Sequence, residues 1–319
     1  MRGDSAMRIV FCGTPEFAVP SLRQLATESD FRVEAVITQP DRPRGRGQRP
    51  GASAVKEAAL VLGLHVYQPE KISSASSEEF LKRFAPDAVM LIAYGQIIPA
   101  RLLALPRLGW INLHASLLPR YRGASPIQWA IANGESSTGL TTMQIAEGLD
   151  TGPILLQSEI EIGPDETAPE LSARMAEVGA PLVVETLRGL NRKEIAPRTQ
   201  DSSAATLARL LKKQDGRIDW TLTAMQIYNR MRGFAPWPGA YSRLRGQTCH
   251  LWGRPGKDAA PHTGRQPGEI FTTSSGVCVA CGSGTFLRLE AAQMEGRKRV
   301  SARDFANGMR LLPGERLGT

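Results

Sequence analysis

The first 200 residues alternate short apolar runs with longer stretches in which apolar residues recur at helical spacing. Short apolar runs bounded by turn residues are typical of buried strands, and their alternation with helices is typical of a parallel sheet covered on its faces. The pattern therefore predicts an α/β fold built on a Rossmann-like, doubly wound, mostly parallel sheet. The expected strands are Arg8–Cys12, Val33–Thr38, Ala88–Ala93, Trp110–His114, Leu140–Ile145 and Ile154–Ile160.

The first expected strand ends in Gly13-Thr14-Pro15, a turn that leads into a helix predicted over Glu16–Ala26. Dinucleotide-binding folds carry a G-x-G-x-x-G fingerprint at this place, and this sequence lacks the full pattern. We therefore do not expect a bound dinucleotide. A helix predicted over 169–189 closes this first domain, which we place at residues 1–193.

The pattern changes after this domain. Residues 194–210 are polar and contain Pro197 and Asp201-Ser202-Ser203, which is typical of a linker. A helix is predicted over Thr223–Phe234, and short apolar runs separated by Gly and Pro follow it. Such spacing is typical of a small β-barrel of the OB type. We therefore expect a second domain at residues 211–319.

Positive charge is concentrated in the last third of the chain. Residues 211–319 carry 17 Lys and Arg against 8 Asp and Glu, a net charge of +9, whereas the other 210 residues carry 22 against 23, a net charge of −1. A basic domain beside a neutral one is typical of a protein with a polyanionic partner such as nucleic acid. A basic surface that serves only solubility explains the charge, taken alone, equally well.

A second basic feature lies in the first domain. Arg42, Arg44, Arg46 and Arg49 fall within eight residues among Pro and Gly, with only Asp41 to oppose them. Four cations cannot be buried in so short a segment, so we expect an exposed loop. A solvated loop without a partner and a site for a small anionic substrate are both compatible with this composition.

The cysteines and histidines give no sign of a metal centre. Four cysteines are too few for a disulfide framework in a chain of 319 residues, which favours a reducing compartment. Cys278 and Cys281 form a C-x-x-C spacing, but zinc needs about four ligands and no second pair exists, so we interpret the pair as structural. The histidines show no ligand spacing; they are His65, His114, His250 and His262.

The chain has no apolar run that approaches the roughly 18–20 residues of a membrane span. Its first residues lack the apolar core of a signal peptide. We therefore expect a cytoplasmic protein.

Two segments carry candidate chemistry. Asn112 and His114 are two residues apart at the end of an expected strand, so their side chains point to one face, roughly 7 Å apart at about 3.4 Å per residue. An amide can donate hydrogen bonds to a carbonyl oxygen, and an imidazole can donate or hold a proton. Asp150 lies in a glycine-flanked turn after another strand. Taken alone, it is interpreted as a turn aspartate that caps backbone N–H groups.

The two segments occur in a recognisable order, Asn112-x-His114-x-Ser116-Leu117-Leu118-Pro119 and then Gly148-Leu149-Asp150-Thr151-Gly152. The pair resembles the folate-dependent formyltransferase superfamily, which includes glycinamide ribonucleotide formyltransferases and methionyl-tRNA formyltransferases. The resemblance runs from about Arg8 to the last turns. The segments most similar to the methionyl-tRNA group are Phe11-x-Gly13-Thr14-Pro15-Glu16-Phe17, Gln39-Pro40-Asp41-Arg42-Pro43-x-Gly45-Arg46-Gly47, Ala93-Tyr94-Gly95, Arg217-Ile218-Asp219-Trp220 and Pro236-Trp237-Pro238.

The resemblance implies transfer of the formyl group of 10-formyltetrahydrofolate to the α-amino group of initiator methionyl-tRNA, for translation initiation. It implies that Asn112 polarises the formyl oxygen, that His114 shares the oxyanion, and that Asp150 holds His114 and assists deprotonation. It also implies a folate-binding set around the first motif. This set is Ser116, Leu117, Leu118, Pro119, Tyr94 and Gly95, and the stretch Tyr94–Pro99 is expected to line the same pocket.

The resemblance further implies that the arginine-rich segment and the basic C-terminal domain contact tRNA. The implied partners are methionyl-tRNA and tetrahydrofolate, without a metal or a membrane, and we expect a monomer. The candidate phosphate contacts are Arg42, Arg44, Arg46, Arg49, Lys212, Lys213, Arg217, Arg297, Lys298 and Arg299.

Two other functions compete with this one. A formyltransferase that acts on a small amine, such as glycinamide ribonucleotide or an amino sugar, explains Asn112, His114 and Asp150 equally well. It leaves the basic domain and the arginine-rich segment without a role. A non-catalytic RNA-binding module on an α/β scaffold explains the charge but makes the polar strand end accidental.

Overall fold

The structure is a computed structural model that describes residues 6–44, 49–256, 264–274, 276–312 and 314–318. The chain forms two compact units. Unit 1 comprises residues 1–126, 137–161 and 172–208, and unit 2 comprises 127–136, 162–171 and 209–319. Two short stretches from the first 193 residues therefore cluster with the C-terminal part of the chain.

Unit 1 contains a sheet with the strand order β5-β2-β1-β6-β7-β8-β9. The pairs from β5 to β7 are parallel, and those of β8 with β7 and β9 are antiparallel. The prediction of a Rossmann-like, mostly parallel sheet is thus confirmed. The strand order reverses at β1, which has β2 on one side and β6 on the other, and α/β folds bind ligands at such a reversal. The strands are β1 (Met7–Gly13), β2 (Phe31–Ile37), β5 (Val66–Tyr67), β6 (Ala88–Ile92), β7 (Trp110–His114), β8 (Ser137–Gln144) and β9 (Ile154–Glu161).

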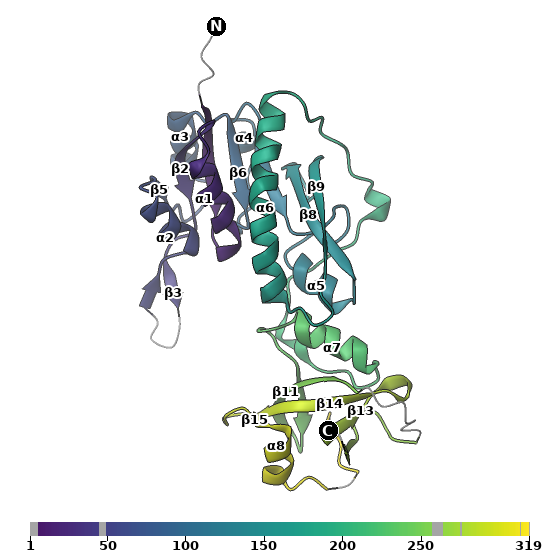
Figure 1. Ribbon diagram of the computed structural model, residues 1–319. Helices are drawn as coiled ribbons and strands as arrows, with labels where there is room; N and C mark the ends of the chain where they lie inside the picture. The colour runs from purple at the N-terminus through teal and green to yellow at the C-terminus, as the bar shows by residue number, and fades with distance from the viewer. Residues whose placement is uncertain (1–5, 45–48, 257–263, 275, 313, 319) are drawn as a thin grey trace. The chain divides into compact units, whose positions relative to one another are not determined.

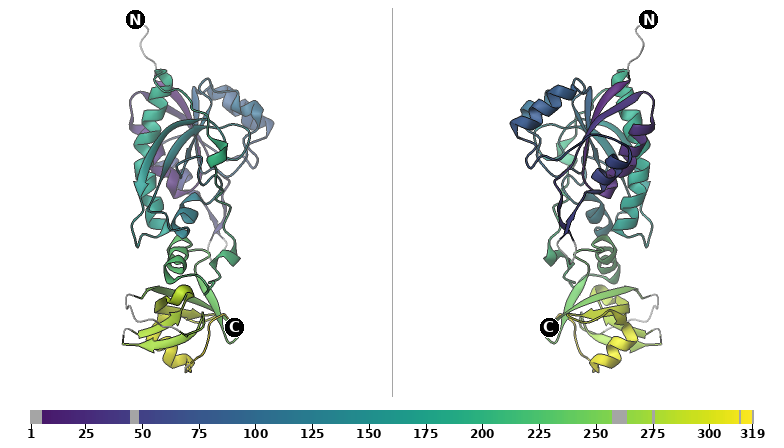
Figure 2. Two further views of the ribbon diagram at one scale, coloured as in Figure 1. Left: turned by 90° about the vertical axis from the view of Figure 1, so that its right-hand side faces the viewer. Right: turned by 90° about the vertical axis from the view of Figure 1, so that its left-hand side faces the viewer.

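Helices cover both faces of this sheet. Figure 2 shows α1 and α6 on one face and α3 and α4 on the other. The helix expected over Glu16–Ala26 begins instead with a 3₁₀ turn, because Pro20 has no N–H to donate to the Glu16 carbonyl. The helices of the first 200 residues are η1 (Glu16–Ala18), α1 (Val19–Thr27), α2 (Ala54–Val61), α3 (Ala75–Phe84), α4 (Ala100–Leu103), α5 (Pro126–Ala132) and α6 (Ala168–Asn191).

Two glycines let these layers approach closely. A Cβ at Gly13 would lie 2.9 Å from the Ile92 carbonyl oxygen, so the turn after β1 fits against β6 only without a side chain. A Cβ at Gly179 would lie 2.8 Å from a methyl group of Leu113, so α6 can pack directly over β7. The first contact joins β1 to β6, and the second supports β7, the strand that carries Asn112 and His114.

The segment after α6 is an ordered part of unit 1 as far as Ala208, although residues 194–210 were predicted to be a linker. Arg198 forms a backbone bridge with Ile154 in β9. The Arg122 N–H donates to the Thr206 carbonyl over 2.8 Å, and the Ala208 N–H donates to the Arg122 carbonyl over 2.7 Å. This segment therefore lies against the loop that follows β7.

The arginine-rich segment forms a short antiparallel pair, β3 (Arg42–Arg44) with β4 (Arg49–Gly51), where a loop was expected. Its base is fixed by Asp41, whose carboxylate accepts from the Lys56 ammonium over 2.6 Å and from the Gln68 amide over 2.7 Å. Arg42 is exposed, and Arg46 lies outside the described residues.

Unit 2 contains an antiparallel sheet with the order β10-β11-β14-β13-β12, and β15 pairs with β14. Helices α7 and α8 pack on it, around an apolar core that includes Trp220, Ile227 and Phe305. Helix α8 was not expected, although Ser301 caps it by accepting from the Asp304 N–H. The elements are η2 (Ser202–Ala204) of unit 1 and η3 (Lys213–Gly216), α7 (Ala224–Gly233), β10 (Tyr241–Leu244), β11 (Gln247–Pro255), β12 (Ile270–Thr273), β13 (Gly276–Ala280), η4 (Gly282–Gly284), β14 (Phe286–Met294), β15 (Val300–Ser301) and α8 (Ala302–Met309) of unit 2.

All four cysteines are buried and free. Burial raises the pKa of the Cys281 thiol to about 12, which keeps it protonated at neutral pH and unsuited to metal binding or redox exchange. The C-x-x-C spacing thus lies in the apolar interior of unit 2, as the structural interpretation requires. Within the described part of the chain, no helix is long and apolar enough to cross a membrane.

Helix α6 is held at its C-terminal end by an arginine between two acids. Arg188 donates to both oxygens of Asp30, over 2.6 and 2.7 Å, and to Glu28 over 2.6 Å. These acids follow α1, which runs beside α6 (Figure 1). Because the Arg188 guanidinium lowers the pKa of Asp30, folding favours its carboxylate form. The resulting stabilisation is present above the ordinary Asp pKa near 3.9 and is lost as pH falls below it.

We expect Arg188→Met to lower the free energy of unfolding by about 1 kcal/mol at neutral pH, because the pair is partly exposed to solvent. The difference from wild type should shrink toward pH 3. Denaturant unfolding at both pH values measures it, with Arg23→Met on the exposed face of α1 as the control. A difference that stays constant with pH would rule out the ion pair as its origin.

Candidate active site

A cavity of about 510 Å³ lies in unit 1, between the segment after β6 and the loop after β8. Its wall is mainly apolar, and Asn112 and Asp150 both contribute to it. Cavities of this size and character bind small organic ligands, with a few polar groups to fix their orientation. The remaining lining residues are Leu91, Gln96, Ile97, Ile98, Pro99, Ala100, Leu103, Met143, Ile145, Ala146, Glu147, Gly148 and Leu149.

Asn112 presents an amide to this cavity from the middle of β7. It is 9% exposed, and its side chain has no hydrogen-bond partner among the described residues. A buried amide normally finds a partner, because burial without a hydrogen bond costs about 1–3 kcal/mol. The Asn112 amide is therefore available to a polar group of a bound ligand.

His114 lies two residues further along β7 and is 6% exposed. Its Nε2 is 2.9 Å from the Tyr121 carbonyl oxygen. Because a carbonyl can only accept, Nε2 carries the proton, and Nδ1 is the nitrogen that can take up or release one. Nδ1 lies 3.7 Å from Oδ2 of Asp150, which is beyond hydrogen-bond distance and leaves room for a further polar atom.

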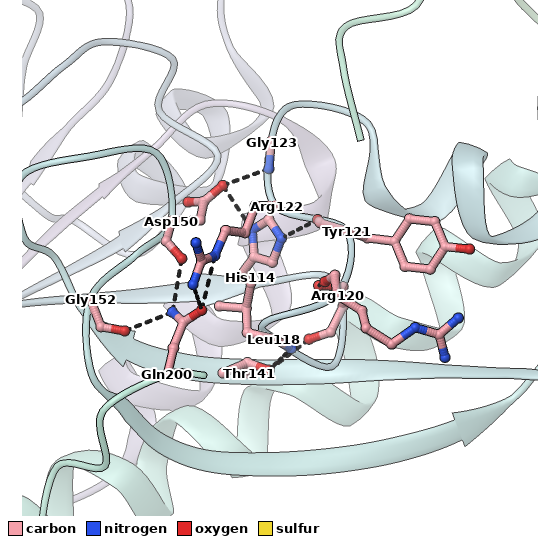
Figure 3. A network of polar contacts seen from close by, with 11 residues as sticks. His114, Leu118, Arg120, Tyr121, Arg122, Gly123, Thr141, Asp150, Gly152 and Gln200 are labelled. Atoms are coloured by element: carbon pink, nitrogen blue, oxygen red, sulfur yellow. Dashed lines mark hydrogen bonds and ion pairs between the residues drawn. The ribbon is translucent and has the colours of Figure 1, made fainter. Parts of the chain in front are cut away.

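Asp150 faces His114 from the loop between β8 and β9, as Figure 3 shows. Its Oδ2 accepts from the Gly123 N–H over 2.8 Å. Its backbone has a φ of +51°, a conformation that Asp and Asn tolerate better than most residues. The carboxyl group is thus held in one position by a strained backbone and a backbone donor. Asp150 therefore faces His114 and shares a cavity wall with Asn112, although it comes from a distant segment of unit 1, and His114 itself does not line that cavity.

A buried pair, Arg122 and Gln200, fixes the loop that carries Asp150. The Gln200 Oε1 accepts from Nε and Nη2 of Arg122, over 3.0 and 2.7 Å. Its Nε2 donates to the carbonyls of Asp150 and Gly152, over 2.8 and 2.7 Å. All four bonds are drawn in Figure 3. One amide side chain thereby connects the loop after β7 to the loop after β8.

The turn that follows His114 is anchored on β8 and β9. Thr141 donates to the Ser116 carbonyl over 2.6 Å and accepts from the Leu118 N–H over 3.1 Å. Gln157 donates to the Leu118 carbonyl over 2.9 Å. The turn delivers the Tyr121 carbonyl to the imidazole, so these contacts also orient His114.

The residues predicted to bind folate do not line the 510 Å³ cavity. Tyr94 is 1% exposed and lies in the apolar core beside it, and Gly95 follows in a turn with a φ of +89°. Ser116, Leu117, Leu118 and Pro119 form the anchored turn described above. The segment Gln96–Ala100, which follows Gly95 in the sequence, lines the cavity instead.

Most of the predicted tRNA contacts that the structure describes are exposed in unit 2. Lys212, Lys213, Arg297 and Lys298 lie at its surface. Arg299 is also exposed, and its guanidinium lies 4.0 Å from the centroid of the Trp252 ring.

Sequence reasoning missed Arg122, Thr141, Gln157 and Gln200. Gln200 lies 78 residues from Arg122 and 50 from Asp150, in a stretch whose composition is typical of a linker. Local pattern carries no signal for such a contact. The run Arg120-Tyr121-Arg122-Gly123 after the first motif was a signal for Arg122 alone. Over the described ranges, no cluster of His, Cys, Asp and Glu could hold a metal ion.

Comparison with known proteins gives a consistent result along the whole chain. A formyl transferase family model matches residues 7–187, and the model of the formyl transferase C-terminal domain matches residues 210–310. The methionyl-tRNA formyltransferase of Solibacter usitatus is 54% identical over 315 residues, which are 98% of this chain and 99% of that protein. The enzyme of the same name from Acidobacterium capsulatum is 50% identical over 98% of this chain and 100% of its own length.

Solved structures share the fold at low identity. A methionyl-tRNA formyltransferase from Clostridium thermocellum superposes with a TM-score of 0.56 at 17% identity, over 79% of this chain and 94% of its own. HypX from Aquifex aeolicus in complex with tetrahydrofolic acid gives a TM-score of 0.60 at 16% identity, over 95% of this chain and 47% of its own. With the two family models and the full-length relatives, the chain belongs to the formyl transferase family, among the methionyl-tRNA formyltransferases.

Proposed function

We propose that this protein transfers the formyl group of 10-formyltetrahydrofolate to the α-amino group of initiator methionyl-tRNA. The observation that carries the proposal is that Asn112 and Asp150 line one cavity while Asp150 also faces His114, with 3.7 Å between Oδ2 and Nδ1. It is supported by relatives of nearly equal length that bear this name. The donor supplies an activated formyl carbon, and the residues of the chain bind it, orient it and move protons.

The cavity suits a flat, partly polar heterocycle. Leu91, Ile98 and Met143 offer apolar contact, and Gln96 and Asn112 offer amides. Ile97 is 91% exposed at the wall of this cavity, which is costly in water and favourable against a bound ring. In our proposal the donor binds in this cavity. The turn Ser116–Pro119, with Tyr94 and Gly95, lies outside the cavity lining and supports the residues that form it.

Asn112 and His114 stabilise the oxygen that gains negative charge when an amine attacks the formyl carbon. The Asn112 amide donates one hydrogen bond to that oxygen. Nδ1 of His114, when protonated, donates a second, because Nε2 is already committed to the Tyr121 carbonyl. Loss of one such donor typically slows acyl transfer about 100-fold or more.

Asp150 accepts the proton that the attacking amine must lose. An α-amino group titrates near 7.7–8.0, so a useful neutral fraction exists at pH 7 and attack needs no strong base. The amine becomes cationic on attack and must lose a proton, which the Asp150 carboxylate accepts directly or through one water. The bond between the formyl carbon and the folate nitrogen then breaks, the oxyanion returns to a carbonyl, and the folate nitrogen takes up the proton as tetrahydrofolate leaves.

In this proposal the tRNA is bound mainly by electrostatic attraction between its phosphates and basic side chains. Exposed lysines and arginines of unit 2, with Arg42 and its neighbours in unit 1, contact phosphates rather than bases. Such contacts position the RNA without reading its sequence.

Replacing Asp150 by Asn tests the catalytic assignment. Asn tolerates the positive φ and can still accept from the Gly123 N–H, so the loop should keep its structure. We expect the rate of formylation to fall by about 100-fold or more while donor binding changes little. Single-turnover formylation of methionyl-tRNA and calorimetric titration with the donor measure the two effects.

Glu177→Gln on the exposed face of α6 removes the same charge and serves as the control. Near-normal formylation by the Asp150→Asn protein would refute the assignment. Offering glycinamide ribonucleotide or an amino sugar in place of methionyl-tRNA tests the acceptor, since efficient formylation of either small amine would favour the competing function.

Gln200 should act as a positioning residue. Gln200→Leu removes four hydrogen bonds and leaves the buried Arg122 guanidinium without its partner. We expect kcat to fall about 10- to 100-fold with KM little changed, because a catalytic group displaced by about 1 Å can cost that much. We also expect faster hydrogen exchange at the Gly123 amide, which a direct chemical role of Gln200 would not produce. Gln214→Leu at the surface is the control. An unchanged kcat of the Gln200→Leu protein would show that Gln200 does not position the site.

The affinity for tRNA should depend steeply on salt. If about four to five phosphates are contacted, the affinity should fall about 100-fold or more between 50 and 200 mM salt. Replacing Arg297 and Lys298 together by Gln should reduce the slope of log K against log salt by roughly 2. Lys71→Gln, exposed in unit 1, serves as the control. An affinity that does not change with salt would count against this surface.

A further inference from the structure

Unit 2 contains a second hollow, remote in sequence from Asn112, His114 and Asp150. It consists of two cavities of about 470 and 340 Å³ that share Pro238, His250 and Gln293 in their walls. All their lining residues belong to unit 2. We call this hollow the sheet groove and define it by the lining residues used below. They are Tyr228, Trp237, Tyr241, His250, Trp252, Gln293, Lys213, Arg254 and Arg299.

Rings from neighbouring strands follow one another along the sheet groove. Tyr241 on β10 pairs with His250 on β11, and their ring centroids are 5.8 Å apart. Trp252 lies two residues beyond His250, so it points to the same face of the sheet. The residues on either side of His250, Cys249 and Leu251, are 0% and 1% exposed and belong to the core. The core of unit 2 is therefore packed from the opposite face, and the rings are left to the solvent side.

A further aromatic side chain stands at the edge of the groove. Trp237, between two prolines, is 56% exposed and lines the smaller cavity. Tyr228 of α7 lines the larger cavity, and its hydroxyl donates to Asp165 over 2.6 Å. An indole with more than half of its surface in water contributes little to the stability of the fold, so its place at this edge fits a role in binding.

Cations lie among these rings. Arg254 pairs with Asp165 over 2.7 Å and with Glu290 over 3.2 Å, so these acids are already neutralised. The Arg299 guanidinium lies 4.0 Å from the centroid of the Trp252 ring. Arg299 and Lys213 have no acidic partner among the residues that the structure describes. The groove therefore offers flat π-surfaces together with two cations that form no ion pair, and Glu295 is a further acid in the wall of the smaller cavity.

We propose that the sheet groove binds an unpaired stretch of RNA, with bases stacked on its rings and phosphates beside Arg299 and Lys213. Proteins bind single-stranded nucleic acid by this combination, because every base has a π-face and every linkage carries a negative charge. The excess of positive charge in residues 211–319, a net +9, favours this occupant over a protein surface of mixed charge. The inference rests on the proposed function, since it assigns to unit 2 a way to hold unpaired nucleotides of a tRNA.

The proposal differs from binding by charge alone in one measurable way. Contacts to phosphates cannot distinguish an RNA from the same chain without its bases, whereas stacking can. The probes are therefore a fluorescein-labelled single-stranded RNA of about six nucleotides, a length that a small β-domain can cover, and an abasic ribose-phosphate chain of equal length and charge. Fluorescence anisotropy with the full-length protein measures both affinities.

We expect the wild-type protein to bind the RNA at least about 10-fold more tightly than the abasic chain, as stacking of one or two bases allows. Trp252→Ala should abolish this preference, and Trp252→Phe, which keeps a ring, should retain most of it. Arg299→Met should weaken binding of both probes, because it removes a charge. Arg303→Met on exposed α8, away from the groove, should change neither.

Equal affinity of the wild-type protein for the two probes overturns the proposal, as does a Trp252→Ala protein that folds with an unchanged melting temperature and keeps the preference. A protein that formylates methionyl-tRNA but ignores the bases of the probe would refute the sheet groove alone. A protein that prefers the bases but formylates no methionyl-tRNA would refute the proposed function and leave the groove intact.

Discussion

The amide side chain of Gln200 joins the two loops of unit 1 that carry Arg122 and Asp150. Gln200 accepts two hydrogen bonds from the buried Arg122 guanidinium and donates two to the backbone on either side of Thr151. Only a group that donates and accepts at once can satisfy both loops, because one offers N–H groups and the other offers carbonyls. The position of Asp150 relative to His114 follows from this arrangement, and the Gly123 N–H completes it.

The imidazole of His114 is also fixed by a single contact. The Tyr121 carbonyl fixes the proton of His114 on Nε2, so Nδ1 becomes the only nitrogen that can serve the reaction. The turn that presents this carbonyl is itself held by Thr141 and Gln157 on the antiparallel strands β8 and β9. The antiparallel edge of the sheet thus helps to orient His114, which lies on a strand that pairs in parallel with β6.

The two units place polar and aromatic side chains by different means. In unit 1 the groups of the site are buried and held by hydrogen bonds, which suits a reaction that needs fixed geometry. In unit 2 the rings of Tyr241, His250 and Trp252 stand on the solvent side of a sheet whose core lies on the other face. Half-exposed rings and unpaired cations suit contacts that must form and dissolve with each substrate.

The sequence alone determined the α/β class, the expected strands and the basic character of the last third, and its motifs predicted Asn112, His114 and Asp150 as site residues. Each of these follows from local periodicity, composition or a contiguous motif. Only the tertiary structure decided which nitrogen of His114 is free, that the turn Ser116–Pro119 is absent from the cavity wall, and that residues 194–208 belong to unit 1. The first outcome depends on the conformation of the turn between His114 and Tyr121, and the last is reflected in contacts of Gln200 with Arg122 and Asp150, 78 and 50 positions away, which no local pattern encodes.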